Sequence, residues 1–259
     1  MAFAICTVGI MPIRAASDDR SEMVSQMLFG EVLEVLEQSS NWAYIRVNYD
    51  RYEGWVDPKQ FTIIDDEEKD RINANPLFYT SDLLQVVVPE NSKQMIPLAI
   101  GSSLPNLMDN KITLAGMEYQ FEGNAVPSDI QASRKLIIEN SMIYLNAPYL
   151  WGGKTPFGVD CSGLTQTVYK LSGIKLPRDA SMQAKQGDII SFITDALIGD
   201  LAFFDNDDEN ITHVGILLGD NKILHASGKV RIDAIDHQGI FNIDTNKYTH
   251  KLRLIKSYL

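Results

Sequence analysis

The hydrophobic pattern changes character near Ser128, and this change limits the folds that the chain can adopt. Upstream, short apolar segments of period two are separated by Gly, Pro and polar turns, as is typical of small β-structures. The segment 41–49 is the clearest, with Ala43, Ile45 and Val47 on one face. Downstream, helical spacing comes first and strands follow. This order predicts an α+β domain with an antiparallel sheet.

The front part divides into two β modules. Residues 1–64 contain several short strand candidates, which together predict a small barrel. Residues 65–75 (DDEEKDRINAN) are charged and are predicted to be a linker. Residues 76–127 return to β signals and are predicted to form a second small β module.

The rear part, residues 128–259, carries the helical signals. A first helix is predicted from Ser128 or Asp129 to about Asn146, and a second begins at Asp160 and ends near Leu171. The strand candidates that follow are residues 187–192, 200–204, 213–218 and 222–226.

Charge and hydropathy exclude several partners. Lys and Arg number 23 and Asp and Glu number 34, so the formal net charge is −11. Such a chain is poorly suited to bind phosphate backbones or anionic lipid, and we expect neither a nucleic-acid nor a membrane partner. The first thirteen residues favour a strand over a signal peptide, because no Lys or Arg precedes them and Gly9 and Pro12 interrupt a helix. We therefore expect a cytoplasmic protein; a signal peptide removed earlier would instead place it in the periplasm or outside the cell.

Cys161 has the local context of a nucleophile. It lies at the predicted start of a helix, where unpaired N–H groups and the helix dipole favour a thiolate. His213 and His225 lie on consecutive strand candidates joined by a tight turn at residues 219–221, which can place them side by side. His213 is the candidate general base and His225 the residue that orients it.

The same three residues allow other interpretations. A lone buried cysteine usually behaves as a small hydrophobic residue, and one Cys with two His could ligate a metal. Pairing in space is not visible in spacing alone. His237 and His250 have no comparable context and are not included among the candidates.

An ordered series of motifs in the rear part resembles a known family. The motifs are YLWGG at 149–153, GVDCSGL at 158–164, LPRD at 176–179, GDLAFF at 199–204, HVGI at 213–216 and KILHAS at 222–227. Together they resemble the NlpC-type cell-wall cysteine peptidases, which are papain-like. The two front modules resemble bacterial SH3-like domains, and EGWV at 53–56 matches the usual end of such a module. The implied architecture is a papain-like catalytic domain preceded by two small all-β SH3-like barrels.

The resemblance also implies a reaction. NlpC-type enzymes hydrolyse the bond between γ-D-glutamate and the next diamino acid of peptidoglycan stem peptides. Members with SH3-like modules in front resemble the dipeptidyl-peptidases of murein peptide recycling, which release L-Ala-γ-D-Glu. The implied partner is a murein peptide, L-Ala-γ-D-Glu-diamino acid, and neither a metal nor an organic cofactor is implied.

Residue roles carried over from the resemblance complete the site. Tyr149 is expected to donate its hydroxyl toward the oxyanion, beside the Cys161 N–H. The residues expected to contact substrate are Trp151, Asp160, Ser162, Asp179, Ala180 and Ser181. Ala180 offers only its backbone where Ser is common in the subgroup, and Ser181 is the substitute.

In the first module, the free amine of L-Ala is expected to meet a carboxylate, since a buried ammonium needs acceptors to replace water. Glu22 is chosen for this role with Tyr52 as its partner, and Tyr44 is the alternative. An exposed loop carboxylate and an exposed strand tyrosine are the competing interpretations. Two other functions stay open: a secreted endopeptidase that acts on intact peptidoglycan, and a non-catalytic binding protein for wall peptides.

Overall fold

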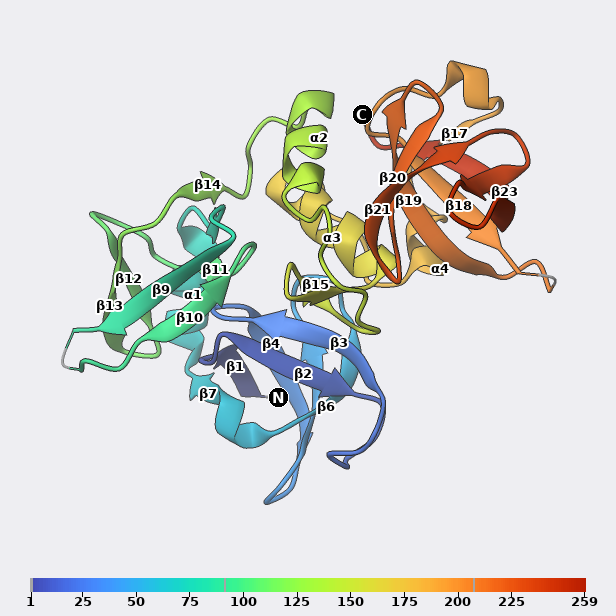
Figure 1. The fold of residues 1–259 in the computed structure, drawn as a ribbon. Helices are drawn as coiled ribbons and strands as arrows, with labels where there is room; N and C mark the ends of the chain where they lie inside the picture. The colour runs from blue at the N-terminus through green and yellow to red at the C-terminus, as the bar shows by residue number, and fades with distance from the viewer. Residues whose placement is uncertain (1, 91, 207) are drawn as a thin grey trace. The chain divides into compact units, whose positions relative to one another are not determined.

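The computed structural model describes residues 2–90, 92–206 and 208–259, and its chain forms two compact units, Met1–Ile130 and Gln131–Leu259 (Figure 1). Strand exceeds helix in this mixed architecture. No helix in the described ranges is long and apolar enough to cross a membrane. Each unit is described in turn.

The first module of unit 1 is one antiparallel sheet of seven strands. The strands are β1 (Ala2–Cys6), β2 (Ile10–Arg14), β3 (Met23–Leu28), β4 (Val32–Gln38), β5 (Ala43–Val47), β6 (Glu53–Val56) and β7 (Phe61–Ile64), in the order β3-β2-β6-β5-β4-β1-β7. A 3₁₀ turn, Pro58–Gln60, precedes β7. The predicted alternation is confirmed, because Ala43, Ile45 and Val47 are buried while Tyr44 and Arg46 are half-exposed. The described residues of the segment 1–13 contribute β1 and most of β2, as expected.

The charged segment at 65–75, predicted to be a linker, is helical. It forms helix α1 (Asp66–Ala74), capped by Asp65, whose carboxylate accepts from the Glu68 N–H at 2.8 Å. Acidic residues in the first turn favour the helix through its dipole. Ile72 alone is apolar and buried, too little for a recognisable apolar stripe.

The second module packs against the first. Its strands are β8 (Phe78–Thr80), β9 (Leu84–Pro89), β10 (Ile96–Ala99), β11 (Ser103–Leu104), β12 (Lys111–Leu114), β13 (Met117–Phe121) and β14 (Ala125–Pro127), in sheets ordered β10-β9-β13-β12 and β11-β8-β14. Phe29 of the first module meets Tyr119 of the second edge to face at 5.7 Å, and the Ser103 N–H donates to the Phe29 carbonyl at 2.9 Å. The two modules therefore share a core.

Unit 2 begins with helix α2 (Arg134–Met142), which is shorter at both ends than the predicted helix. Ser133 caps it, and its hydroxyl accepts from the Leu136 N–H at 3.3 Å. Arg134 then bonds Asp200 at 2.8 Å and the Ile198 carbonyl at 2.7 Å. These contacts attach α2 to the strands that follow.

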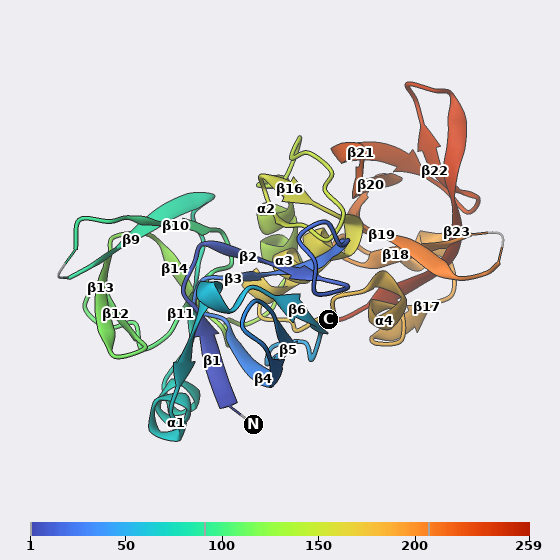
Figure 2. The ribbon, with the colours of Figure 1, turned by 90° about the horizontal axis from the view of Figure 1, so that it is seen from below.

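The other elements of unit 2 are two helices and a sheet that closes on itself. They are β15 (Lys154–Thr155), β16 (Gly158–Val159), α3 (Cys161–Leu171), α4 (Ala180–Gln183), β17 (Asp188–Ile190), a 3₁₀ turn (Ile193–Asp195), β18 (Leu201–Asp205), β19 (Ile211–Gly219), β20 (Lys222–Ser227), β21 (Lys229–Ile235), β22 (Gly239–Asn242) and β23 (Lys247–Ser257). Because β22 also pairs with β23, strands β18–β23 close into a six-stranded barrel, seen as a ring in Figure 2. The antiparallel sheet expected from the sequence is thus present and closes into a barrel, whose interior holds the apolar cluster around Phe204, Ile223 and Ile240.

Candidate active site

Helix α3 starts at the candidate nucleophile. Asp160 is its N-cap residue and accepts from the Gly163 N–H at 2.7 Å, which confirms the predicted helix start. A Cβ on Gly163 would lie 2.1 Å from the Gly153 carbonyl oxygen, so only glycine lets the loop at 152–153 close on the first turn. Cys161 is buried there, and the N–H groups of Ser162 and Val214 donate to its sulfur. Since Val214 follows His213 on β19, Cys161 lies against the strand that carries the candidate base.

The two candidate histidines meet inside one end of the barrel. The His213 Nε2 lies 2.9 Å from the His225 Nδ1, and the His225 Nε2 lies 3.0 Å from the Asp233 Oδ2. Because His225 donates to the carboxylate through Nε2, its Nδ1 is an acceptor for the His213 Nε2–H. The His213 Nδ1 is then the nitrogen left to take a proton from the thiol.

Strand register explains why the rings converge. Gly215 of β19 pairs with His225 of β20, so His213 and His225 lie diagonally on the same face of neighbouring strands. A Cβ on Gly215 would lie 3.0 Å from the His225 Cβ and 2.7 Å from an Ile223 methyl group. The absence of a side chain at 215 makes room for the Ile223 side chain and the His225 Cβ.

A buried ion pair fixes the residues on either side of Cys161. Arg178, which is 2% exposed, donates to both oxygens of Asp160 at 3.0 and 2.6 Å and to the Ser162 hydroxyl at 2.8 Å. Asp160 also accepts from the Gly152 N–H at 2.8 Å. Both carboxylate oxygens thus have protein donors, so the structure gives Asp160 and Ser162 a positioning role. Their expected contact with substrate stays a prediction.

Burial favours the neutral form of both the thiol and the imidazole. Burial, followed by the charge of Asp160, raises the pKa of the Cys161 thiol to about 12, although Val214, Arg178 and Ser162 act to lower it. Burial, together with His250 and His225, holds the pKa of His213 well below its usual value near 6.5. The expectation of a thiolate stabilised by the helix start is therefore wrong, because burial outweighs the dipole. His213 must remove the proton as the sulfur attacks.

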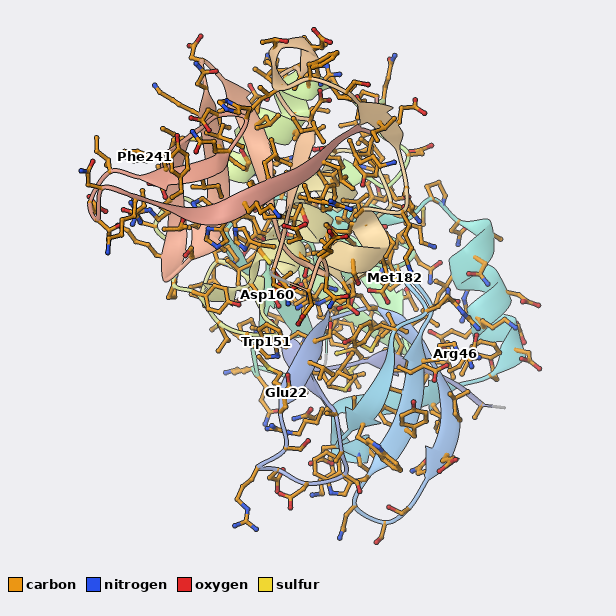
Figure 3. The ribbon with its side chains drawn as sticks, turned by 90° about the vertical axis from the view of Figure 1, so that its right-hand side faces the viewer. Glu22, Arg46, Trp151, Asp160, Met182 and Phe241 are labelled. Carbon is orange, nitrogen blue, oxygen red and sulfur yellow. The ribbon has the colours of Figure 1, made fainter. Side chains whose placement is uncertain are left out.

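Tyr149 lies close enough to Cys161 for the two groups to interact electrostatically. Burial, with the charges of Cys161 and Asp160, raises the pKa of Tyr149 to about 12, so its hydroxyl keeps its proton at neutral pH and can donate. Trp151 is 59% exposed and lies beside the start of α3, because the next residue, Gly152, bonds Asp160 (Figure 3). The position of Tyr149 is compatible with its expected role as oxyanion donor, and that of Trp151 with its expected contact with substrate. Both roles stay predictions.

The remaining expected contacts cluster at α4. Asp179 is the exposed N-cap residue of that helix, Ala180 is buried and Ser181 is exposed. Gln183 joins α4 to α3, since its side-chain amide accepts from Thr165 at 2.8 Å and donates to the Ser162 carbonyl at 3.1 Å. The structure thus brings this segment to the nucleophile's helix, and Ser181 has a hydroxyl to offer where Ala180 has none.

Comparisons with known proteins agree with this geometry. The NlpC/P60 family model matches residues 146–249, and the model of the bacterial dipeptidyl-peptidase Sh3 domain matches residues 13–61. A gamma-D-glutamyl-L-lysine dipeptidyl-peptidase of Bacillus subtilis (strain 168) is 30% identical over 217 residues, which cover 78% of this chain and 71% of that protein. The chain belongs to the NlpC/P60 family. It is a cysteine peptidase.

Two further comparisons span nearly the whole chain. A dipeptidyl-peptidase 6 of Lysinibacillus sphaericus is 29% identical over 272 residues, covering 91% of this chain and 92% of that protein. The crystal structure of an NlpC/P60 family protein from Bacillus cereus ATCC 10987 superposes with a TM-score of 0.85 at 21% identity, covering 99% of both chains. The fold therefore extends to the front modules. The roles of Cys161, His213 and His225 stay predictions, which the experiments below test.

Sequence reasoning missed two residues of this NlpC/P60 site. Asp233 bonds His225 and is itself bonded by Arg231 at 2.8 Å, which lowers the pKa of Asp233 against its burial. His250 stacks on His213 with ring centroids 4.2 Å apart. Both lie on strands that were not predicted, β21 and β23. The local sequence held no signal for Asp233, because its burial and the pairing of β21 with the His225 strand are visible only in the structure.

The residues chosen in the first module lie in unit 1. Glu22 is exposed in the loop before β3 (Figure 3), and its carbonyl accepts from the Ala15 N–H at 2.9 Å. Tyr52 is half-buried against the first module's core. Tyr44 instead bonds Glu53 at 3.1 Å and packs on Trp55 at 5.2 Å. Their expected roles in amine recognition stay predictions.

Gly215 provides a test of the barrel geometry in this NlpC/P60 peptidase. The Gly215→Ala variant should lose on the order of 10–100-fold in kcat, because the new methyl group displaces His225 and with it His213. Overpacking of this kind costs about 1–3 kcal/mol of stability. Steady-state kinetics and thermal unfolding measure the two effects. A variant with wild-type kcat would contradict the placement of His225.

The pH dependence of kcat/KM on its acid side tests whether the pKa of His213 is lowered. A general base acts when unprotonated, so a lowered His213 pKa moves the acid limb of kcat/KM below pH 6.5. Activity is then retained through pH 6.5 and lost only as pH falls through the depressed pKa. We expect this in kcat/KM measured from about pH 4 to about pH 9. An acid limb centred above the usual histidine value would oppose the assignment.

Proposed function

We propose that this peptidase hydrolyses the γ-D-Glu–diamino acid bond of free murein stem peptides and releases L-Ala-γ-D-Glu, in peptidoglycan peptide recycling. The observation that carries the proposal is a dipeptidyl-peptidase Sh3 match at residues 13–61 in the same chain as the Cys161–His213–His225 arrangement. Relatives that match 78% and 91% of this chain are named gamma-D-glutamyl-L-lysine dipeptidyl-peptidase and dipeptidyl-peptidase 6. A cytoplasmic location belongs to the same proposal.

The reaction follows from the neutral thiol–imidazole pair. As the Cys161 sulfur attacks the γ-carbonyl of D-Glu, its proton passes to the His213 Nδ1, and the imidazolium is held by His225 and Asp233 behind it. The C–N bond then breaks, and His213 returns the proton to the leaving amine of the diamino acid. Water, deprotonated by His213, attacks the thioester and releases the dipeptide with the free thiol.

The oxyanion of each tetrahedral intermediate needs donors near the attacked carbon. The Cys161 N–H belongs to the first turn of α3, whose N–H groups have no acceptor within the helix. The protonated Tyr149 hydroxyl is the second donor in the proposal. Fixed donors of this kind are worth about 10²–10³-fold in kcat each.

Dipeptide release requires recognition of the free amine. We assign this to the first module, with Glu22 for the ammonium and Tyr52 as its partner. A carboxylate paired with a desolvated ammonium makes a strong charge-assisted hydrogen bond, so a blocked amine should be rejected. The second β module serves in this proposal as the scaffold of the first, with which it shares a core.

Mass spectrometry of two peptide pairs tests the proposal. L-Ala-γ-D-Glu-L-Lys and its meso-diaminopimelate counterpart are each incubated with the full chain, free and N-acetylated. Release of L-Ala-γ-D-Glu from the free peptides only is the expected result. Cleavage of the acetylated peptides as well would refute the assignment of Glu22 and Tyr52 while keeping the peptidase. Cleavage of intact sacculi but of neither tripeptide would favour the endopeptidase, and binding without any cleavage would favour the non-catalytic alternative.

A further inference from the structure

His250 covers the candidate general base. It lies on β23 opposite Ile240 of β22, and its ring is nearly parallel to that of His213, with an interplanar angle of 26° and centroids 4.2 Å apart. His225 meets His250 edge to face at 5.6 Å. Three imidazoles from three strands thus fill one end of the barrel.

Neighbouring side chains hold His250 in this orientation. The Thr249 Oγ1 lies within hydrogen-bond distance of the His250 Nδ1, at 2.9 Å. Phe204 of β18 contacts both rings, with centroids 5.8 Å from His213 and 5.9 Å from His250. The stacked pair therefore has contacts from two further side chains, with His213 buried and His250 half-buried.

A shared metal ion fits this arrangement poorly. One nitrogen from each of His213, His225 and His250 lies within 4.8 Å of the others. The lone pair of an imidazole nitrogen lies in the plane of its ring, however, and two nearly parallel rings with centroids 4.2 Å apart do not direct their lone pairs at one ion. The His213 Nε2 is in addition bonded to His225. Stacking, and not chelation, is what the ring geometry supports.

A base held by one hydrogen bond is incompletely positioned. The bond to His225 fixes the His213 Nε2 in the ring plane but leaves the ring free to tilt about that bond. We propose that His250 is a positioning residue that, by stacking on His213, blocks this tilt, directs the Nδ1 toward Cys161 and keeps water from the ring. It acts through His213 and does not touch the reacting atoms.

The charged and titratable groups around His213 agree with this role. His225 from β20 and His250 from β23 face it directly. Asp233 from β21 lies behind His225 and is bonded by Arg231. Cys161 of α3 is bonded by the N–H of Val214, the residue after His213 on β19. Burial is the first cause of the low pKa of His213, and His250 supplies part of that burial. Burial also lowers the pKa of His250 to about 4, so its ring is neutral at the pH of catalysis and adds no positive charge beside an imidazolium.

Alkylation of Cys161 by iodoacetamide tests the inference without any peptide substrate. Its rate is measured across pH by peptide mass mapping in wild type and in the variants His250→Phe, His250→Leu and His250→Ala, with the buried Cys6 as internal reference. Phe keeps an aromatic face, Leu fills the volume without one, and Ala opens the ring to water. His237→Ala is the matched control, since His237 is exposed in the same unit.

We expect Ala and Leu to slow alkylation at neutral pH by about ten-fold or more, in line with a misplaced catalytic group. Ala should also move the acid midpoint upward, because a hydrated imidazole protonates more readily. Phe should stay within about two-fold of wild type. Wild-type rates and midpoint in both Ala and Leu, or equal losses in Phe and Leu, would overturn the inference. If Ala fails to fold, the comparison of Phe with Leu decides alone, and neither result depends on which peptide is cleaved.

Discussion

Replacing Cys161 by alanine is expected to lower kcat/KM on a γ-D-glutamyl tripeptide by on the order of 10⁵-fold, as removal of a nucleophile does in other triad hydrolases. The thioester cannot form without the sulfur, and His213 and His225 have no proton to move. The fold should persist, because Cys161 is a small side chain at a helix start that Asp160 still caps. Peptide hydrolysis followed by mass spectrometry, with the thermal unfolding temperature, measures both.

Cys6→Ala is the matched control for this loss. Cys6 is also buried and lacks a disulfide, but it belongs to the core of the first module. We expect wild-type kcat/KM in Cys6→Ala. Residual activity of Cys161→Ala within about 100-fold of wild type would show that another group attacks the peptide, since nucleophile removal costs far more.

Arg178→Met is expected to destabilise unit 2 by roughly 3–5 kcal/mol, because it leaves the buried Asp160 carboxylate without its cation. Asp160 is 6% exposed and receives both guanidinium bonds from Arg178. Arg178 also acts to lower the pKa of the Cys161 thiol, so its loss raises that pKa further. Activity should therefore fall together with stability. Thermal unfolding and kcat/KM are the measurements.

Two companion variants separate charge from geometry. Arg178→Lys keeps the cation but loses the two-pronged contact, and we expect intermediate stability and activity. Asp160→Asn combined with Arg178→Met removes both charges and should recover part of the stability lost in Arg178→Met. Lys185→Met, which changes an exposed cation, is the control. Equal unfolding temperatures for Arg178→Met and wild type would refute the structural role of the pair.

Local signals predicted the start of the site well. Asp160 followed by Cys161 marks an N-cap in the sequence, and the helix begins where the pattern indicates. His213 and His225 were placed on neighbouring strands by the tight turn between them, and register then brings the rings to 2.9 Å. These features depend on contacts close in sequence, which residue patterns reveal.

The last strands escaped prediction for a physical reason. In β21, Asp233 is buried inside the barrel while Ile232 is 37% exposed outside, which reverses the usual alternation. In β23, the inward position of His250 is likewise polar. Polar side chains at inward positions therefore hide the alternation by which these two strands could be recognised. Barrel closure by β22 and β23 also depends on pairing that no local pattern specifies.

The direction of the Cys161 pKa shift was predicted wrongly for a related reason. The sequence shows a helix start, which favours a thiolate, but it does not show burial. In the structure, burial and Asp160 together raise the pKa of Cys161 to about 12. The tertiary environment, and not the local motif, thus decides the pKa of the Cys161 thiol.

Partition of the acylated enzyme by hydroxylamine tests the central claim, that Cys161 forms a thioester with the dipeptide. The full chain cleaves L-Ala-γ-D-Glu-L-Lys in neutral buffer with hydroxylamine present, and the products are identified by mass. The account predicts the hydroxamate of L-Ala-γ-D-Glu in addition to the free acid, with its share rising with hydroxylamine concentration and none formed by Cys161→Ala. Rapid release of the free acid alone at every hydroxylamine concentration would indicate direct attack by water and contradict the account.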